Sequence, residues 1–450
     1  MCKCANEYMV LIKLIKLIKL IKLIKLIKLF KLIKLFKLIK LFKLIKLIKQ
    51  HNTMNKKYFF AAILGLAATI FTSVSCDNND EPNPGGNDDP ATVDYTSENA
   101  DAWGNYMMNT ARLLKADAQK LYTNWAEKYG DNDKSYAELF KAHDNASGYG
   151  NVDQAIQEMV EKMGEIANEV GSSKIGDPYA KWVAGQKTQA LYAVESWYSW
   201  HSRDDYTNNI KSIRNAYYGT RDGQIAENSL AKALEGTAID TKVRQYITDA
   251  ENAIQAITQP FRNHIGSVEA QNAMTACEKL QKVLGEIETE DGKVTGDATN
   301  LKTEAIKLPE ATKNAIINNF VDNVVVPTYR DLVTRNNALK AAVDAFAANP
   351  SNAGFEACCT AWMEAREPWE TSEAFLFGPV DELGLDPNMD SWPLDQNGIM
   401  QIMKSKKWSD LDWAPGDDDA KVESAQNVRG FHTLEFLIFK DGNPRTVSKK

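Results

Sequence analysis

The chain has 450 residues, a quarter of them charged, and a formal net charge of −7. Its first 75 residues hold 16 lysines and one glutamate, a net charge of +15, which leaves −22 for the remainder. Because nucleic-acid binding relies on cationic side chains, so acidic a remainder argues against nucleic acid as a partner.

Residues 1–53 are dominated by a low-complexity repeat, in which a lysine falls at every third position from Lys13 to Lys49. An α-helix turns about 100° per residue, so this spacing spreads the lysines around the whole helix. The repeat also carries too many charges for an ordinary membrane span. We interpret it as an upstream segment absent from the mature protein, with a basic membrane-surface segment as the alternative.

Residues 54–75 have the pattern of a bacterial lipoprotein signal peptide. Lys56 and Lys57 precede an apolar run from Phe59 to Val74, and the small residue Ser75 comes directly before Cys76. This pattern predicts that Cys76 is lipidated and becomes the mature N-terminus. A membrane-anchoring helix is the weaker interpretation, because the apolar run is short.

Residues 76–97 are rich in Pro, Gly, Asn and Asp, which predicts a flexible tether. The acidic residues behind Cys76 resemble the surface-export signal of Bacteroidetes lipoproteins. We therefore predict a protein of the bacterial cell envelope, anchored to the outer membrane through lipid on Cys76. Exposure at the cell surface is a further hypothesis.

From residue 98 onward the apolar residues follow helical spacing, and strand-like alternation is almost absent. Helices are predicted around residues 105–125, 156–166, 177–197, 205–218, 238–257, 268–287, 309–348, 354–377 and 427–439. Pro327 is expected to interrupt one of them. The predicted fold class is all-α, with two antiparallel helical bundles formed by residues 98–300 and 301–450.

Three cysteines remain in this helical part, Cys277, Cys358 and Cys359. The chain has no C-x-x-C motif, so neither a zinc-knuckle nor a thioredoxin-like site is predicted. Their apolar surroundings favour buried thiols. A disulfide between Cys277 and one of the other two is left open.

Near the C-terminus the chain contains the motif Gly430-x-His432-x-x-Glu435 within an apolar run. Residues three apart share one face of a helix, so His432 and Glu435 are expected to point into the same packed environment. Burial of both is costly unless each finds a partner or a metal ion. The pair is therefore either a functional site or a well-satisfied structural contact.

Two other segments combine polar and aromatic side chains. In residues 365–377 several of them share a predicted helix face, which leads into an aromatic loop at residues 386–395. In residues 195–201 Glu195 and Ser199 are expected one helical turn apart. The candidate ligand-binding residues of these segments are Arg366, Trp369, Glu373, Asp390, Glu195, Ser196 and Ser199.

Together these motifs resemble the imelysin family of bacterial envelope proteins. The resemblance rests on Arg366, Trp369, Ser372–Phe375, Gly378-Pro379, Asp390–Pro393 and the Gly430-x-His432-x-x-Glu435 motif, while residues 195–219 resemble the other half of the family. In typical members the half with Gly-x-His-x-x-Glu comes first. The reversed order here predicts a circular permutation, in which the helix at residues 105–125 completes the bundle that holds His432.

The resemblance implies a pair of helical bundles with a polar cleft, and two functions. Some members are described as insulin-cleaving metallopeptidases, and others resemble components of iron uptake. A zinc peptidase needs three protein ligands and a general base, but His432 and Glu435 supply at most two ligands and there is no His-Glu-x-x-His motif. The candidates for a third ligand are Glu195, Glu373, Asp390 and His201.

Binding without catalysis needs fewer groups. We therefore favour a protein that binds a metal ion, iron or zinc, or a metal-bearing ligand, with His432 and Glu435 as metal ligands. Arg366 would neutralise a carboxylate or hold an anionic ligand. The alternatives are a metallopeptidase and a non-catalytic structural or adhesive surface module. A serine triad of Ser196 or Ser199 with His432 and Asp390 lacks a nucleophile-elbow motif.

Overall fold

The computed structural model describes residues 93–285, 289–290, 293–294 and 299–447, all within one compact unit. The predicted upstream segment, signal peptide, Cys76 and most of the tether lie outside the described residues. The described strands form two short antiparallel pairs, β1 (Thr289–Glu290) with β2 (Lys293–Val294) and β3 (Phe439–Lys440) with β4 (Asn443–Pro444). The other regular elements are helices, so the predicted all-α class is confirmed.

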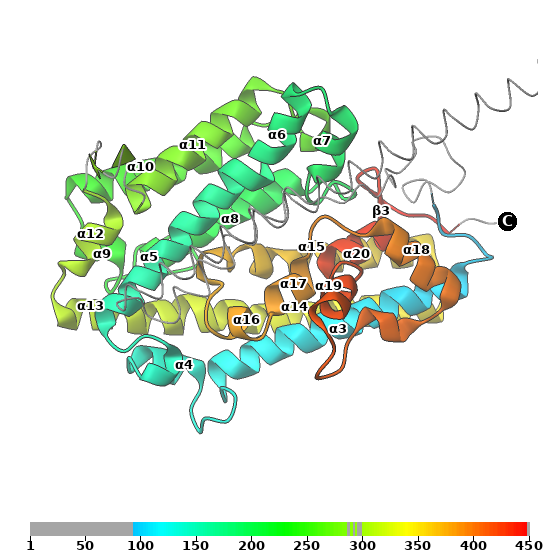
Figure 1. Ribbon diagram of the computed structural model, residues 1–450, viewed down its shortest axis with the longest axis horizontal. Coiled ribbons are helices and arrows are strands. Elements are labelled where there is room, and N and C mark those ends of the chain that lie inside the picture. Colours follow the sequence, from blue (N-terminus) through cyan, green and yellow to red (C-terminus); the bar gives the residue numbers. More distant parts are fainter. Residues whose placement is uncertain (1–92, 286–288, 291–292, 295–298, 448–450) are drawn as a thin grey trace, which may run out of the picture. The chain divides into compact units, whose positions relative to one another are not determined.

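One group of helices surrounds the C-terminal motif. Helix α3 (Ala100–Ala126) packs against α14 (Val326–Ala348) and α20 (Gly430–Ile438), and α14 packs against α15 (Asn352–Glu370) (Figure 1). Trp103 of α3 donates its indole N–H to Leu437 O at 2.9 Å, and Tyr106 donates its hydroxyl to Val428 O at 2.8 Å. The prediction that the helix at residues 105–125 completes the bundle of His432 is confirmed.

A second group consists of α5 (Val152–Asn168), α8 (Ser202–Tyr218), α10 (Ala238–Gln255) and α11 (Val268–Leu284). Helix α10 packs against α8 and α11, while α5 packs against α8, α11 and α12 (Leu301–Ile306) (Figure 1). The two groups meet where α8 contacts α15. Because α12 packs with helices that precede residue 300, and α3 packs with helices that follow it, the packing crosses that division of the sequence.

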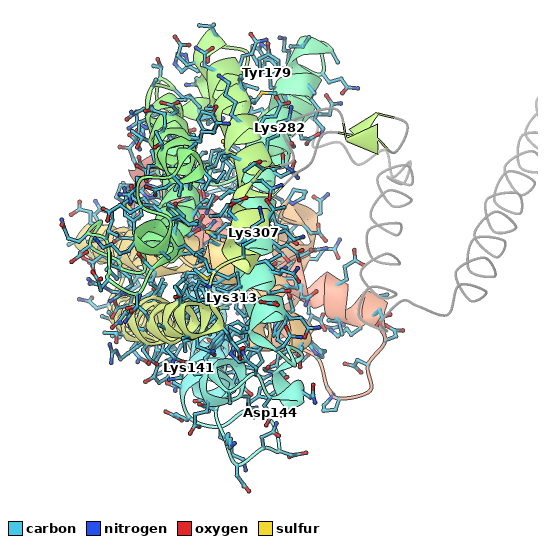
Figure 2. The ribbon with its side chains drawn as sticks, turned by 90° about the vertical axis from the view of Figure 1, so that its left-hand side faces the viewer. Lys141, Asp144, Tyr179, Lys282, Lys307 and Lys313 are labelled. Atoms are coloured by element: carbon cyan, nitrogen blue, oxygen red, sulfur yellow. The ribbon has the colours of Figure 1, made fainter. Side chains whose placement is uncertain are left out.

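Shorter elements connect the two groups. The remaining described α-helices are α4 (Tyr136–Lys141), α6 (Gly176–Val183), α7 (Lys187–Ala193), α9 (Leu230–Ala233), α13 (Glu310–Phe320), α16 (Pro379–Glu382), α17 (Leu385–Asp390), α18 (Gln396–Ser405) and α19 (Asp419–Gln426). The 3₁₀ segments are η2 (Asn145–Ser147), η4 (Phe261–Asn263), η6 (Glu373–Phe375) and η7 (Trp408–Leu411). The π-helical segments are η3 (Glu169–Lys174) and η5 (Val321–Val325). Ion pairs join some of them to neighbouring elements, because Lys313 pairs with Asp153 and Lys141 pairs with Asp322. Figure 2 labels Lys313 and Lys141 on the side of the molecule that it shows.

The predicted helix at residues 177–197 is divided into two helices and ends earlier than predicted. Helix α6 ends at Val183, α7 ends at Ala193, and residues 195–200 form turns. Ser196 and Trp200 have φ angles of +53° and +63°, a left-handed conformation that side chains other than glycine rarely adopt. Glu195 and Ser199 therefore do not share a helix face, and tertiary contacts hold this segment instead.

Two other boundaries differ from the predictions. Helix α15 ends at Glu370, so Glu373 lies in η6 and not on the same helix as Arg366. Asp390, predicted in a loop, is the last residue of α17. The interruption expected at Pro327 takes the form of the π-helical segment η5, directly before α14 begins.

Two further features bear on the predictions. Cys277, Cys358 and Cys359 are buried free thiols, so none of them forms a disulfide. Among the described helices, none has the length and apolar character needed to cross a lipid bilayer.

Candidate functional site

Gly430 determines how closely α20 approaches the rest of the site. Its φ angle is +89°, and a Cβ atom at this position would lie 2.5 Å from the carbonyl oxygen of Met389. No side chain fits there, because real Cβ atoms essentially never come within 3.0 Å of such an atom. The missing side chain lets the start of α20 touch the end of α17, which brings His432 next to Asp390.

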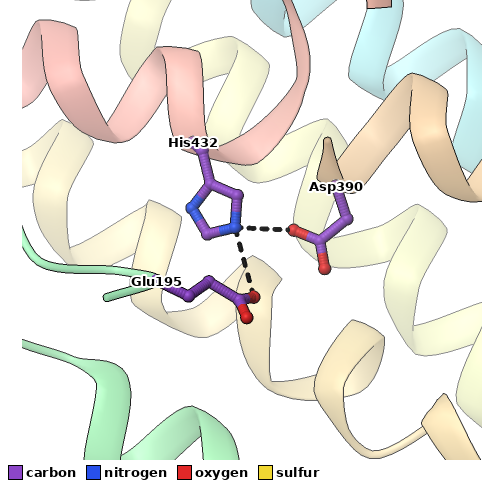
Figure 3. Close-up of side chains that lie close together, drawn as sticks. All are labelled: Glu195, Asp390 and His432. Atoms are coloured by element: carbon purple, nitrogen blue, oxygen red, sulfur yellow. Dashed lines mark hydrogen bonds and ion pairs between the residues drawn. The ribbon is translucent and has the colours of Figure 1, made fainter. Parts of the chain in front are cut away.

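The imidazole of His432 lies at the centre of the site and is wholly buried. Its Nε2 atom is 3.0 Å from Asp390 Oδ1 and 3.3 Å from Glu195 Oε1, as Figure 3 shows. Burial and Arg366 each lower the pKa of His432, but Asp390 and Glu195 outweigh them and hold the pKa well above its usual value. The two carboxylates therefore favour the protonated form of the ring.

Glu435 holds the other side of this ring. Its Oε2 atom lies 3.0 Å from His432 Nδ1, and its Oε1 atom accepts hydrogen bonds from the Ser199 amide at 2.8 Å and the Ser199 hydroxyl at 2.7 Å. Glu435 was predicted to be a metal ligand together with His432. Because it occupies Nδ1, on the side of the ring opposite Asp390 and Glu195, it instead orients the imidazole.

Arg366 of α15 is wholly buried and surrounded by acceptors. Its Nη2 atom donates to Glu195 Oε1 at 2.8 Å, and its Nη1 atom pairs with Asp390. Its Nε atom lies 3.3 Å from Asp205 Oδ2, and Nη2 also lies 2.6 Å from Glu370 Oε1. Of its two predicted roles, Arg366 therefore neutralises carboxylates, and its donors are not free for an anionic ligand.

Asp390 is held in place by three partners. Trp369 donates its indole N–H to Asp390 Oδ2 at 2.6 Å, while Arg366 and His432 contact Oδ1. Burial raises the pKa of this carboxyl group, but Arg366 and His432 outweigh burial and keep the pKa below its usual range. Asp390 is thus an oriented, ionised carboxylate.

Lys174 is a member of the site that the sequence analysis missed. Its Nζ atom lies 3.1 Å from Glu195 Oε2. Burial raises the pKa of Glu195, but Lys174 and His432 outweigh it and bring the pKa to about 2. Lys174 belongs to the π-helical segment η3, and no periodic pattern marks it. Glu370, in contrast, follows Arg366 by four residues on α15, so helical spacing could have identified it.

The other predicted residues lie at the margin of this cluster. Glu373 belongs to an acidic group with Glu370 and Asp390, whose carboxylate oxygens lie within 4.8 Å of one another. Burial, with help from Asp205 and Asp390, raises the pKa of Glu370 to about 8 despite Arg366.

The serine triad is not formed. The Ser196 hydroxyl donates to Asp205 Oδ2 at 2.5 Å, and the Ser199 hydroxyl donates to Glu435, so neither hydroxyl donates to His432. His201 lies 3.8 Å from Asp205 Oδ1 through Nε2 and is not part of the ligand group around His432. Of the four candidates for a third ligand, Glu195 and Asp390 have ligand atoms grouped with His432, whereas Glu373 is grouped with Glu370 and Asp390.

Glu195, Asp390 and His432 each direct one potential ligand atom into this cluster, and the three atoms lie within 4.8 Å of one another (Figure 3). One imidazole nitrogen and two carboxylate oxygens form a donor set that suits Fe²⁺, Mn²⁺ or Zn²⁺. The residues present therefore fit a divalent transition-metal ion.

These features define an all-α protein in which two groups of helices meet around a buried cluster of histidine, carboxylates and arginine. The sequence profile of the imelysin family, also named Peptidase M75, matches residues 81–287 and 325–449. The chain belongs to the imelysin family, as the sequence resemblance implied. The predicted circular permutation stays a prediction.

Two proteins that are similar to this chain carry different functional descriptions. The crystal structure of an imelysin peptidase from Bacteroides ovatus is 56% identical, with a TM-score of 0.75, and the match covers 80% of this chain and 100% of that one. Iron-regulated protein A of Synechococcus elongatus is 35% identical over 132 residues, which are 29% of this chain and 33% of that protein. The chain thus spans about a third of the length of this curated relative.

Proposed function

We propose that this protein binds a metal ion or a metal-bearing ligand at the cell envelope, in a role connected with iron uptake. The observation that carries the proposal is the convergence of Glu195, Asp390 and His432, with ligand atoms within 4.8 Å of one another. Iron is the first candidate, because a relative is described as an iron-regulated protein. Zinc suits the same donors.

The charge balance of the cluster supports a cation as the ligand. Besides the three proposed ligands, Asp205, Glu370 and Glu435 contribute buried carboxyl groups. Within the described residues, the five carboxyl groups of the cluster face two buried Arg or Lys side chains, Arg366 and Lys174, and the protonated His432. A histidine binds a metal only as the neutral imidazole, so a metal ion competes with the proton on His432 Nε2. Glu435 would then keep Nδ1 fixed while Nε2 binds.

Equilibrium dialysis against Fe²⁺ or Zn²⁺, followed by elemental analysis, tests this proposal. The wild-type protein is expected to retain a stoichiometric amount of metal, and the His432→Ala/Glu435→Ala double variant is expected to lose it. His264→Ala is the matched control, because His264 belongs to no described group of potential metal ligands. Equal retention by the wild type and the double variant would place any metal elsewhere.

A metallopeptidase is the second candidate, because a 56% identical relative is described as an imelysin peptidase. Three ligands could hold a catalytic zinc ion. However, the imidazole of His432 is wholly buried and Glu195 nearly so, and a peptide substrate must reach the metal. Incubation with unfolded insulin chains, with and without a chelator, separates the two functions. If the wild type cleaves these chains and the double variant does not, the peptidase function replaces the binding function proposed above.

We also propose that the protein is a lipoprotein of the outer membrane, on the basis of the sequence around Cys76. When cells are grown with radiolabelled palmitate, the label should enter the wild-type protein and the control variant Cys277→Ala, but not the variant Cys76→Ala. Label that enters Cys76→Ala equally would remove this assignment.

A further inference from the structure

Arg366 contacts the same atoms that would bind a metal ion. Its Nη2 atom lies 2.8 Å from Glu195 Oε1 and 3.3 Å from His432 Nε2, and its Nη1 atom pairs with Asp390 Oδ1. Glu195, Asp390 and His432 are the side chains that converge in Figure 3. A transition-metal ion binds such atoms at about 2.0–2.2 Å. Because two cations repel strongly in a buried environment, the guanidinium and a metal ion compete for these oxygens.

Arg366 also has partners outside the ligand group. Its Nε atom lies 3.3 Å from Asp205 Oδ2, and its Nη2 atom lies 2.6 Å from Glu370 Oε1. Asp205 Oδ1 is buried and has no hydrogen-bond partner among the described residues, so Asp205 has acceptor capacity to spare. The guanidinium can therefore leave Glu195 and Asp390 and still remain paired with two buried carboxyl groups.

We infer that Arg366 is a resident counter-cation of the site, which an incoming divalent cation must displace from Glu195 and Asp390. This inference rests on the proposed metal-binding function. Without a bound metal ion, Arg366 compensates the carboxylates and keeps the buried cluster folded. When a metal ion binds, the cost of moving Arg366 weakens the affinity, which suits a protein that must release its metal as well as bind it.

Titration of the full chain with Mn²⁺, after removal of bound metal with a chelator, tests this inference. Free Mn²⁺ is followed by electron paramagnetic resonance, and the variants are Arg366→Gln and Arg366→Lys. Arg366→Gln should bind Mn²⁺ at least about tenfold more tightly than the wild type, because no cation has to be displaced. Arg366→Lys should lie between them, because a shorter ammonium group reaches fewer of the carboxylates.

Arg445→Gln is the matched control. Arg445 is also buried and paired with a carboxylate, Asp94 at 2.7 Å, but it contacts none of the three ligands. Its Mn²⁺ affinity should equal that of the wild type. Thermal melts identify any variant that fails to fold, and Arg366→Lys retains the buried charge if Arg366→Gln does not fold.

The outcomes separate this inference from the function on which it rests. If the wild type binds Mn²⁺ and both Arg366 variants bind equally or more weakly, then Arg366 supports binding and only the inference is wrong. If neither the wild type nor any Arg366 variant binds, the proposed function fails and the inference fails with it. Binding that appears or tightens only in the Arg366 variants supports both.

Discussion

At the scale of single residues, Gly430 is a position where both the φ angle and the neighbouring backbone require glycine. Gly430→Ala should destabilise the protein by about 2–4 kcal/mol, because an added Cβ must move the backbone at Met389 and adopt a strained left-handed conformation. Chemical denaturation measures the loss. Gly416→Ala is the matched control, since its φ angle of +97° is similar but nothing lies within 4 Å of its Cβ position. Equal losses in both variants would show that φ alone matters.

The indole N–H of Trp369 provides a second residue-scale prediction. Trp369→Phe should lower the free energy of unfolding by about 1.5–3 kcal/mol more than the smaller ring alone would, because a hydrogen bond to the ionised Asp390 disappears. Trp125→Phe is the control, since Trp125 is equally buried but its Nε1 has no hydrogen-bond partner among the described residues. The difference between the two variants in urea unfolding isolates the hydrogen bond, and no difference would contradict the role given to Trp369.

The sequence predicted part of this site, for reasons that differ from residue to residue. Helical spacing alone placed His432 and Glu435 on one face, and both are buried as a pair. Glu195 lies 237 positions from His432, so only the family resemblance could connect them. The turn that presents Glu195 could not be predicted, because contacts such as that of the Ser199 amide with Glu435 override local helix preference.

At the scale of elements, α3 and α20 belong together although the sequence separates them almost maximally. Tyr106 of α3 donates its hydroxyl to Val428 O, directly before α20, at 2.8 Å. Tyr106→Phe should therefore destabilise the protein by about 1–2 kcal/mol, because a buried carbonyl oxygen loses its partner. Tyr122→Phe on the same helix is the control, since Tyr122 has no hydrogen bond within the described residues. A larger effect at Tyr122 would contradict the proposed link between α3 and α20.

The contact between α3 and α20 also illustrates which features of the fold the sequence could predict. Apolar spacing identified most helices, because each needs one buried face. The partners of each helix depend on contacts between distant segments, which spacing does not encode. The expectation that residues 105–125 complete the bundle of His432 anticipated one such contact between helices, and it came from comparing the order of the two halves with that of the imelysin family.

At the scale of the whole molecule, the buried cluster should couple metal binding to global stability. The cluster joins α15, α17 and α20 to the turn before α8, so a bound metal ion would cross-link both groups of helices. A ligand that binds only the folded state stabilises it by about 2.7 kcal/mol at a concentration 100 times its dissociation constant. Mn²⁺ at such a concentration should therefore raise the melting temperature of the chelator-treated wild type by about 2–4 °C, given the unfolding entropy typical of a chain of this size.

The acidic surface offers a competing explanation, which the same melts can separate. Cations that only screen surface charge would stabilise every variant alike, and added NaCl at matched ionic strength would do the same. A cation held by the cluster should lose its effect in His432→Gln, because the uncharged amide cannot replace the imidazole nitrogen between Asp390 and Glu195. If His432→Gln gains as much stability from Mn²⁺ as the wild type, the stabilising ion lies on the surface and not in the cluster.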